Sequence, residues 1–124
     1  MITIKTKAAP EAVGPYSQGI VVEGMVFCSG QIALDPESME MVGDTAGEQT
    51  RQVLVNLSEV LKAGGCAMEK VAKTTVYLAD MADYAEVNAA YADFFGKHQP
   101  ARAAVEVSRL PKDAKVEIEC IGVL

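Results

Sequence analysis

The stretch from Pro100 to Glu119, PARAAVEVSRLPKDAKVEIE, contains two β-patterned runs. They are Arg102–Val107 and Val116–Cys120, and a turn containing Pro and Asp separates them. The first run opens with an arginine, whereas the second carries Glu117 and Glu119. If the two runs lie near each other in one sheet, a guanidinium and a carboxylate can face the same cavity. Such a pair can hold a carboxylate substrate and move a proton beside it.

The middle of the chain predicts two long helices. Thr45 and Glu48 have the spacing of a capping box, and an apolar stripe continues this first helix over residues 45–63. Asp83 and Glu86 repeat the spacing ahead of a second apolar stripe. We interpret both stripes as ordinary core rather than as cofactor-binding segments.

The remaining segments predict strands and complete an α+β fold. Gly24, between two apolar runs, indicates a tight hairpin. We expect about six strands in a mixed sheet, with both helices packed on one face, in a single domain over residues 1–124. The other strand candidates are Ile2–Thr6, Gly19–Glu23, Met25–Ser29 and Val71–Ala79.

Side-chain alternation in the last strand indicates an oligomer. Successive side chains of a strand point to opposite faces, so that charged and aliphatic side chains share one face there. A face fully in water has no need of the aliphatic ones, and we expect another subunit to cover part of it. By the same rule Arg102 and Ala104 share one side of the preceding strand. The side chains that share the mixed face are Glu117, Glu119, Ile121 and Val123.

Composition favours a globular, cytoplasmic protein. The chain has 124 residues, of which 50% are hydrophobic, and a net charge of −6. No apolar run approaches the roughly 20 residues that a membrane helix needs. The start of the chain lacks the apolar core of a signal peptide. The acidic charge opposes binding to nucleic acids.

The residues that most often bind metals predict no metal site. The single histidine, His98, lies near the end of the second expected helix, where an interaction with the helix dipole is expected. The three cysteines, Cys28, Cys66 and Cys120, lack the spacing of metal ligands and lie in apolar segments. We expect them to be small buried hydrophobic residues.

Several polar or small residues have two interpretations. Tyr16, on a loop stiffened by prolines, either covers a core edge or lines the mouth of a pocket. Asn88 lies off the apolar stripe of its helix and is either a solvated amide or part of a site. Gly30 follows a strand and allows another chain or a ligand to approach closely. Alternation alone also leaves open whether Glu117 or Glu119 is the functional carboxylate.

A set of short motifs, in order along nearly the whole chain, resembles the RidA family, also called YjgF. Each motif is weak by itself, and the set is specific. The motifs are Gly14-Pro15-Tyr16-Ser17-Gln18-Gly19, Ser29-Gly30-Gln31, Val87-Asn88-Ala89-Ala90-Tyr91, Pro100-Ala101-Arg102, Glu106-Val107-Ser108-Arg109-Leu110-Pro111-Lys112-Asp113 and Val116-Glu117-Ile118-Glu119.

The resemblance implies a homotrimer of chorismate-mutase-like α+β subunits with an active site at each subunit interface. It also implies a hydrolase, a 2-iminobutanoate/2-iminopropanoate deaminase that needs no metal or cofactor. Such enzymes convert reactive 2-enamine and 2-imino acids, released by pyridoxal-phosphate dehydratases, into 2-oxo acids and ammonia.

The resemblance also assigns roles to residues. Arg102 matches the arginine that binds the substrate carboxylate, and Glu117, rather than Glu119, matches the glutamate that activates water. Many members have Cys where this chain has Ala104, so that only the backbone can contribute there. The other implied pocket positions are the side chains of Tyr16, Ser29 and Asn88 and the backbone at Gly30 and Ala104.

Two alternative functions use the same fold. One is a binding or chaperone-like trimer that holds small molecules in the interface clefts without turnover. The other is RNA cleavage or inhibition of translation, an activity also attributed to the family. The acidic charge and the single histidine disfavour RNA cleavage.

Overall fold

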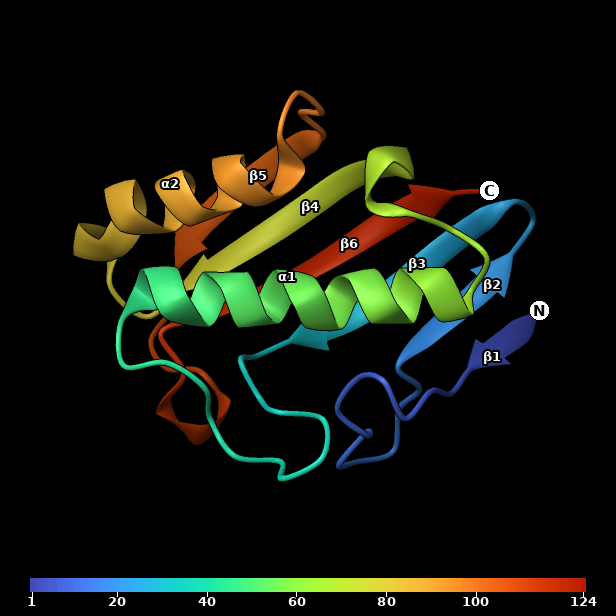
Figure 1. The fold of residues 1–124 in the computed structure, drawn as a ribbon, viewed down its shortest axis with the longest axis horizontal. Coiled ribbons are helices and arrows are strands. Elements are labelled where there is room, and N and C mark those ends of the chain that lie inside the picture. The colour runs from blue at the N-terminus through green and yellow to red at the C-terminus, as the bar shows by residue number, and fades with distance from the viewer.

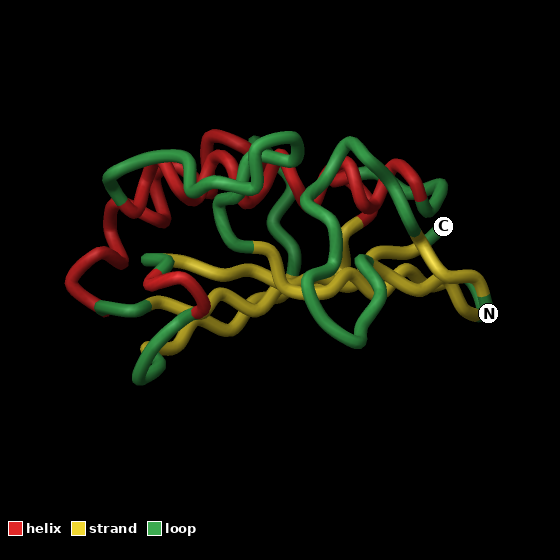
Figure 2. Tube along the Cα trace, turned by 90° about the horizontal axis from the view of Figure 1, so that it is seen from below, coloured by secondary structure: helices red, strands yellow, loops and turns green.

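The computed structural model describes residues 1–124 as one layer of strands covered on one face by helices (Figures 1 and 2). The six strands lie in the order β1-β2-β3-β6-β4-β5. This arrangement confirms the predicted α+β fold with both helices on one face. The strands are β1 Ile2–Ile4, β2 Gly19–Val22, β3 Met25–Gln31, β4 Val71–Leu78, β5 Ala101–Glu106 and β6 Val116–Val123.

The sheet is mixed, as predicted, because one of its pairings is parallel. β4 and β5 run parallel, and all other neighbours are antiparallel. A parallel pair needs a crossover connection, which α2 provides. β5 therefore lies at an edge, and β4 lies between β5 and β6. The two runs of the C-terminal stretch share one sheet but do not pair with each other.

Two helices, α1 (Ala46–Ala63) and α2 (Tyr84–Phe95), form the second layer (Figure 1). The apolar stripe of α1 is fully buried against the sheet, as its 3.6-residue periodicity predicts. All three cysteines are free and buried, which confirms their interpretation as core residues. Neither helix has the length and apolar composition required to cross a membrane.

The predicted caps are right for α1 and wrong for α2. The Thr45 hydroxyl accepts a hydrogen bond from the Glu48 amide at 3.2 Å. Asp83 makes no such bond, because a short 3₁₀ turn over Met81–Asp83 gives it a non-extended backbone. The Glu86 carboxylate instead accepts from the Gly47 amide in the first turn of α1, at 2.9 Å. Glu86 therefore links the two helices.

The last strand is longer than predicted, and the histidine ring contacts the sheet rather than the end of a helix. β6 continues to Val123 because Phe27 and Met25 of β3 pair with Ile121 and Val123. The hairpin at Gly24 is present as predicted, with a φ of +76° at that glycine. The ring of His98 is not at the end of α2: its Nε2 lies 2.6 Å from the Val71 carbonyl of the sheet.

The two helix starts give a matched test of capping. Thr45→Ala should lower the free energy of unfolding by about 1 kcal/mol, because it removes the hydrogen bond to the Glu48 amide. Asp83→Ala should change it by less than about 0.5 kcal/mol, since this side chain makes no cap bond. Urea denaturation of both variants at equal protein concentration measures the difference. Equal losses would contradict the assigned caps.

Candidate active site

Arg102 projects from the edge strand toward the helical layer. In the parallel register it pairs with Thr74, which is fully buried beneath α2. Paired residues of neighbouring strands point to the same face of a sheet, so Arg102 also points toward α2. Its guanidinium carbon lies 4.8 Å from the centre of the Tyr91 ring, and its Nη2 donates to the Tyr84 hydroxyl at 3.1 Å.

The aromatic platform under Arg102 is itself fixed. The hydroxyl groups of Tyr91 and Thr74 are 2.7 Å apart in a buried hydrogen bond, which joins α2 to β4. The Tyr91 ring also packs on Phe95, with 4.6 Å between ring centres. A guanidinium over an aromatic face gains cation–π attraction while its N–H groups stay free to bind an anion.

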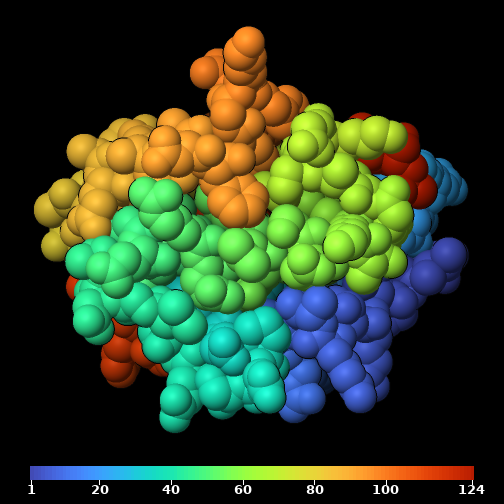
Figure 3. Space-filling view, in the orientation of Figure 1, coloured from blue at the N-terminus to red at the C-terminus, as the bar shows by residue number.

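A pocket of about 320 Å³ lies beside this platform. One wall belongs to α2 and the other to the segment that joins α2 to β5, which projects from the surface in the space-filling view (orange, top of Figure 3). Arg102 makes none of the ion pairs in the molecule, so its charge is available to an anion. The lining residues are Asn88, Tyr91, Ala92, Phe95, Gly96, His98, Gln99, Pro100 and Arg102.

Glu117 lies on the other face of the sheet. It pairs with Tyr77 of β4 and points to the same face as Tyr77. Tyr77 is three residues from Thr74, so the side chains of Tyr77 and Thr74 point to opposite faces of the sheet. Glu117 is half-buried, and burial, together with the negative charge of Glu119, raises its pKa. Glu119 itself accepts a hydrogen bond from the Tyr77 hydroxyl at 2.6 Å.

An irregularity in β3 makes room for the Glu117 carboxylate. The register with β6 shifts between Cys28 and Gln31, so that Ser29 and Gly30 together oppose one residue. A Cβ atom added at Gly30 would lie 3.1 Å from Cδ of Glu117, tighter than ordinary packing. The Ser29 hydroxyl donates to the Ser17 carbonyl at 2.5 Å and thereby fixes the preceding loop to β3.

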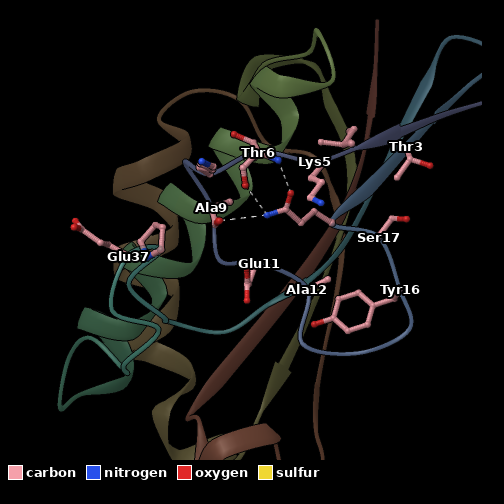
Figure 4. Close-up of a pocket in the computed structure, with 13 residues that line it drawn as sticks. Thr3, Lys5, Thr6, Ala9, Glu11, Ala12, Tyr16, Ser17 and Glu37 are labelled. Atoms are coloured by element: carbon pink, nitrogen blue, oxygen red, sulfur yellow. Dashed lines mark hydrogen bonds between the residues drawn. The ribbon is translucent and has the colours of Figure 1, made fainter.

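Tyr16 lies on that loop, apart from both charged groups. It is 51% exposed, and its hydroxyl accepts a weak hydrogen bond from the Val13 amide at 3.4 Å. It lines a hollow of about 1090 Å³ that contains neither Arg102 nor Glu117, and its ring lies beside Ala12 (Figure 4). This hollow is the larger of the two, but its walls carry fewer candidate residues. We therefore place the candidate site at the smaller pocket.

One chain thus brings some predicted residues together and separates others. Arg102 and Asn88 line the same pocket, and Ala104 lies on the same face of β5 as Arg102. Glu117 and Gly30 adjoin each other on the opposite face. The idea that Arg102 and Glu117 face one cavity is wrong within a single chain, because β4 separates their strands and alternation turns them to opposite faces.

Three further residues of these sites do not emerge from the sequence. The apolar stripe of α2 accounts for Tyr84 and Tyr91 as core residues only, although both contact Arg102. The strand pattern predicts no contact for Tyr77, although the Tyr77 hydroxyl donates a hydrogen bond to Glu119. Their contacts depend on the strand register, which no local pattern reveals. No group of three or more His, Cys, Asp or Glu side chains is arranged to hold a metal ion.

Comparisons with known proteins agree on one family. The family model described as Endoribonuclease L-PSP matches residues 6–124. A RutC family protein of Synechocystis is 52% identical over 100% of this chain and 97% of its own length. A human protein named 2-iminobutanoate/2-iminopropanoate deaminase is 45% identical over 97% of this chain and 88% of its own length. The crystal structure of E. coli TdcF with bound serine superimposes with a TM-score of 0.95 at 41% identity, over 100% of this chain and 98% of that one.

The acidic pair in β6 gives a test of the electrostatics. Glu119→Gln should lower the pKa of Glu117 part of the way to its ordinary value, because it removes a nearby negative charge but leaves the larger effect of burial. Carbon-detected NMR titration of the glutamate carboxyl groups measures this. Glu37→Gln, a change in an exposed loop, is the control. An unchanged Glu117 titration in Glu119→Gln would show that the two carboxylates do not interact.

The raised pKa of Glu117 also predicts the direction in which stability changes with pH. Between its unfolded and folded pKa values, Glu117 binds more protons in the folded state, so stability should fall as the pH rises through this window. Glu117→Gln should flatten this part of the curve of unfolding free energy against pH. A curve as steep as in the wild type would assign the slope to other groups.

Proposed function

The chain belongs to the Endoribonuclease L-PSP family, the RidA/YjgF family, and from this membership we propose that it hydrolyses reactive 2-imino acids to 2-oxo acids and ammonia. The proposed substrates are 2-iminobutanoate and 2-iminopropanoate with their enamine forms. Their removal would protect pyridoxal-phosphate enzymes. We treat residues 1–124 as one catalytic domain that uses no cofactor.

The observation that supports the proposal best is the environment of the Arg102 guanidinium. Its guanidinium lines a pocket, rests on an aromatic ring and has no carboxylate partner in the chain. A planar guanidinium can donate two parallel, charge-assisted hydrogen bonds to a carboxylate, which orients the substrate as well as binding it. The relative with bound serine shows that a protein of this fold accepts a small amino acid. Asn88, in the same pocket, can contribute an amide.

Glu117 is the proposed proton carrier. Water adds through its oxygen to C2 of the imine, and the Glu117 carboxylate accepts a proton from that water. The proton then passes to the nitrogen, which gives a carbinolamine with a hydroxyl and an amino group on C2. The Glu117 carboxylate next accepts the hydroxyl proton and passes it to the amino nitrogen as the C2–N bond breaks, so that ammonia leaves and the 2-oxo acid is formed. A carboxylate with a raised pKa suits this exchange, because it gains and loses a proton near neutral pH more readily than an ordinary glutamate.

Arg102 and Glu117 act on one substrate, in this proposal, from two different subunits. They lie on opposite faces of the sheet of one chain, so a complete site requires a second copy. The open face of the sheet also exposes apolar side chains, including Phe27 at 39% and Val105 at 44%. Burial of such side chains favours association. We propose a homotrimer, with Ser29, Gly30 and Tyr16 completing each site at a subunit interface.

RNA cleavage, which the family description names, receives less support from this chain. The net charge of −6 opposes binding to a phosphate backbone. Nε2 of the single histidine contacts the Val71 carbonyl. A pair of acid–base histidines is therefore not available.

A coupled assay tests the deaminase proposal. A threonine dehydratase generates the imine, semicarbazide traps the free imine, and formation of 2-oxobutanoate is followed. Wild-type protein should accelerate the formation of 2-oxobutanoate. The Arg102→Ala variant should lose about 2–5 kcal/mol of transition-state stabilisation, because the substrate carboxylate loses its partner. Arg102→Lys, which keeps the charge but not the fork, should be intermediate. An Arg102→Ala protein of unchanged assembly and kcat/KM would overturn the proposed role.

A mixture of inactive variants tests whether subunits share a site. Arg102→Ala and Glu117→Gln should each be inactive alone. If one subunit supplies Arg102 and its neighbour Glu117, a co-refolded equal mixture should regain about a quarter of the wild-type sites. Native mass spectrometry confirms that mixed oligomers form. Mixed oligomers without regained activity would mean that both groups act within one subunit.

A further inference from the structure

Tyr84 occupies the position where α2 meets the Arg102 guanidinium. Its hydroxyl oxygen accepts a hydrogen bond from Nη2 of Arg102 at 3.1 Å, and the guanidinium carbon lies 5.7 Å from its ring centre. Asn88 lies one helical turn further along α2 and lines the same pocket as Arg102. Tyr84 is 38% exposed, so a ligand can reach it.

The hydroxyl of Tyr84 has one hydrogen-bonding function left. A phenolic oxygen can accept through its lone pairs and donate through its single proton. The hydrogen bond with Arg102 is donated to the oxygen, so it does not use the proton. The proton is then free to be donated to an acceptor that approaches the same guanidinium.

Tyr91, the other tyrosine at Arg102, cannot take this role. Its hydroxyl is buried and already engaged with Thr74 at 2.7 Å, so it offers Arg102 only the face of its ring. Tyr84 is therefore the only tyrosine in contact with Arg102 that can present a hydroxyl to a ligand.

We propose that Tyr84 is a further substrate-binding residue, whose hydroxyl donates a hydrogen bond to the carboxylate held by Arg102. This inference rests on the proposed function and adds a third donor to the arginine fork. It defines the ligand class as 2-oxo or 2-imino acids with a free carboxylate, bound by two guanidinium N–H groups and one phenol. A donor already polarised by a neighbouring cation forms a stronger bond to an anion than an isolated phenol does.

The surroundings of Tyr84 set how this contact should respond to pH. Its pKa is lowered by the Asn88 amide and by the Arg102 charge. Burial raises the pKa of Tyr91, so that residue ionises later, and Cys120 behind Tyr91 also has a raised pKa. His98 lines the same pocket. As the pH rises through the pKa of Tyr84, its donor becomes a phenolate that repels the ligand carboxylate and competes for Arg102.

Calorimetric binding of 2-oxobutanoate, the stable product, tests the inference on the intact protein. Tyr84→Phe removes one hydroxyl and keeps the ring, and should weaken binding about tenfold, the usual effect of one hydrogen bond to a charged group. In the deaminase assay KM should rise by a similar factor while kcat stays nearly constant. Wild-type affinity should also fall at alkaline pH, between the pKa values of Tyr84 and Tyr91, and the affinity of Tyr84→Phe should fall less there.

The possible outcomes separate the inference from the proposed function. If the wild type deaminates the imine and Tyr84→Phe binds 2-oxobutanoate with unchanged affinity, the role of Tyr84 is overturned and the proposed function stands. The role of Tyr84 is likewise overturned if the affinities of both proteins fall equally at alkaline pH. It is also overturned if Tyr84→Phe loses affinity only in proportion to a lowered Tm. A wild type that neither deaminates nor binds 2-oxobutanoate overturns both proposals.

Discussion

Side-chain alternation along β4 is the constraint on which the arrangement of charged groups depends. Thr74 and Tyr77 are three residues apart and therefore point to opposite faces of the sheet. Thr74 is in register with Arg102 of β5, and Tyr77 is in register with Glu117 of β6. A central strand buried on its helical face cannot slip by one residue, because its apolar side chains would move into water. The positions of the cation and the carboxylate are thus fixed together.

The two faces give these groups different environments. On the helical side an aromatic platform, tied to the core by the bond between Tyr91 and Thr74, holds a guanidinium without a carboxylate partner. On the open side Glu117 is partly shielded from water and lies beside Glu119, and both effects raise its pKa. One group is prepared to receive an anion and the other to receive a proton. Our proposal of a site shared between subunits follows from this separation.

The packing around each group also explains residues that have no chemistry of their own. Gly30 leaves the space that the Glu117 carboxylate fills. Glu86 joins α2 to the first turn of α1, and so helps to fix the helix that carries Tyr84 and Tyr91. The favourable interaction of a carboxylate with a helix N-terminus accounts for this choice of partner.

Local sequence patterns are sufficient to predict the fold class and most of the elements. Periodicity placed both helices on one face, Thr45 marked the start of α1, and the motifs around Arg102 and Glu117 identified the family. These features are local, because each depends on neighbours along the chain. Three features follow only from the folded arrangement. β4 lies between the two charged strands, Glu86 bonds to α1 rather than capping its own helix, and tyrosines of the apolar stripe contact Arg102. These contacts depend on strand order and register. Strand order and register result from burial of the whole core, so a short stretch of sequence does not predict them.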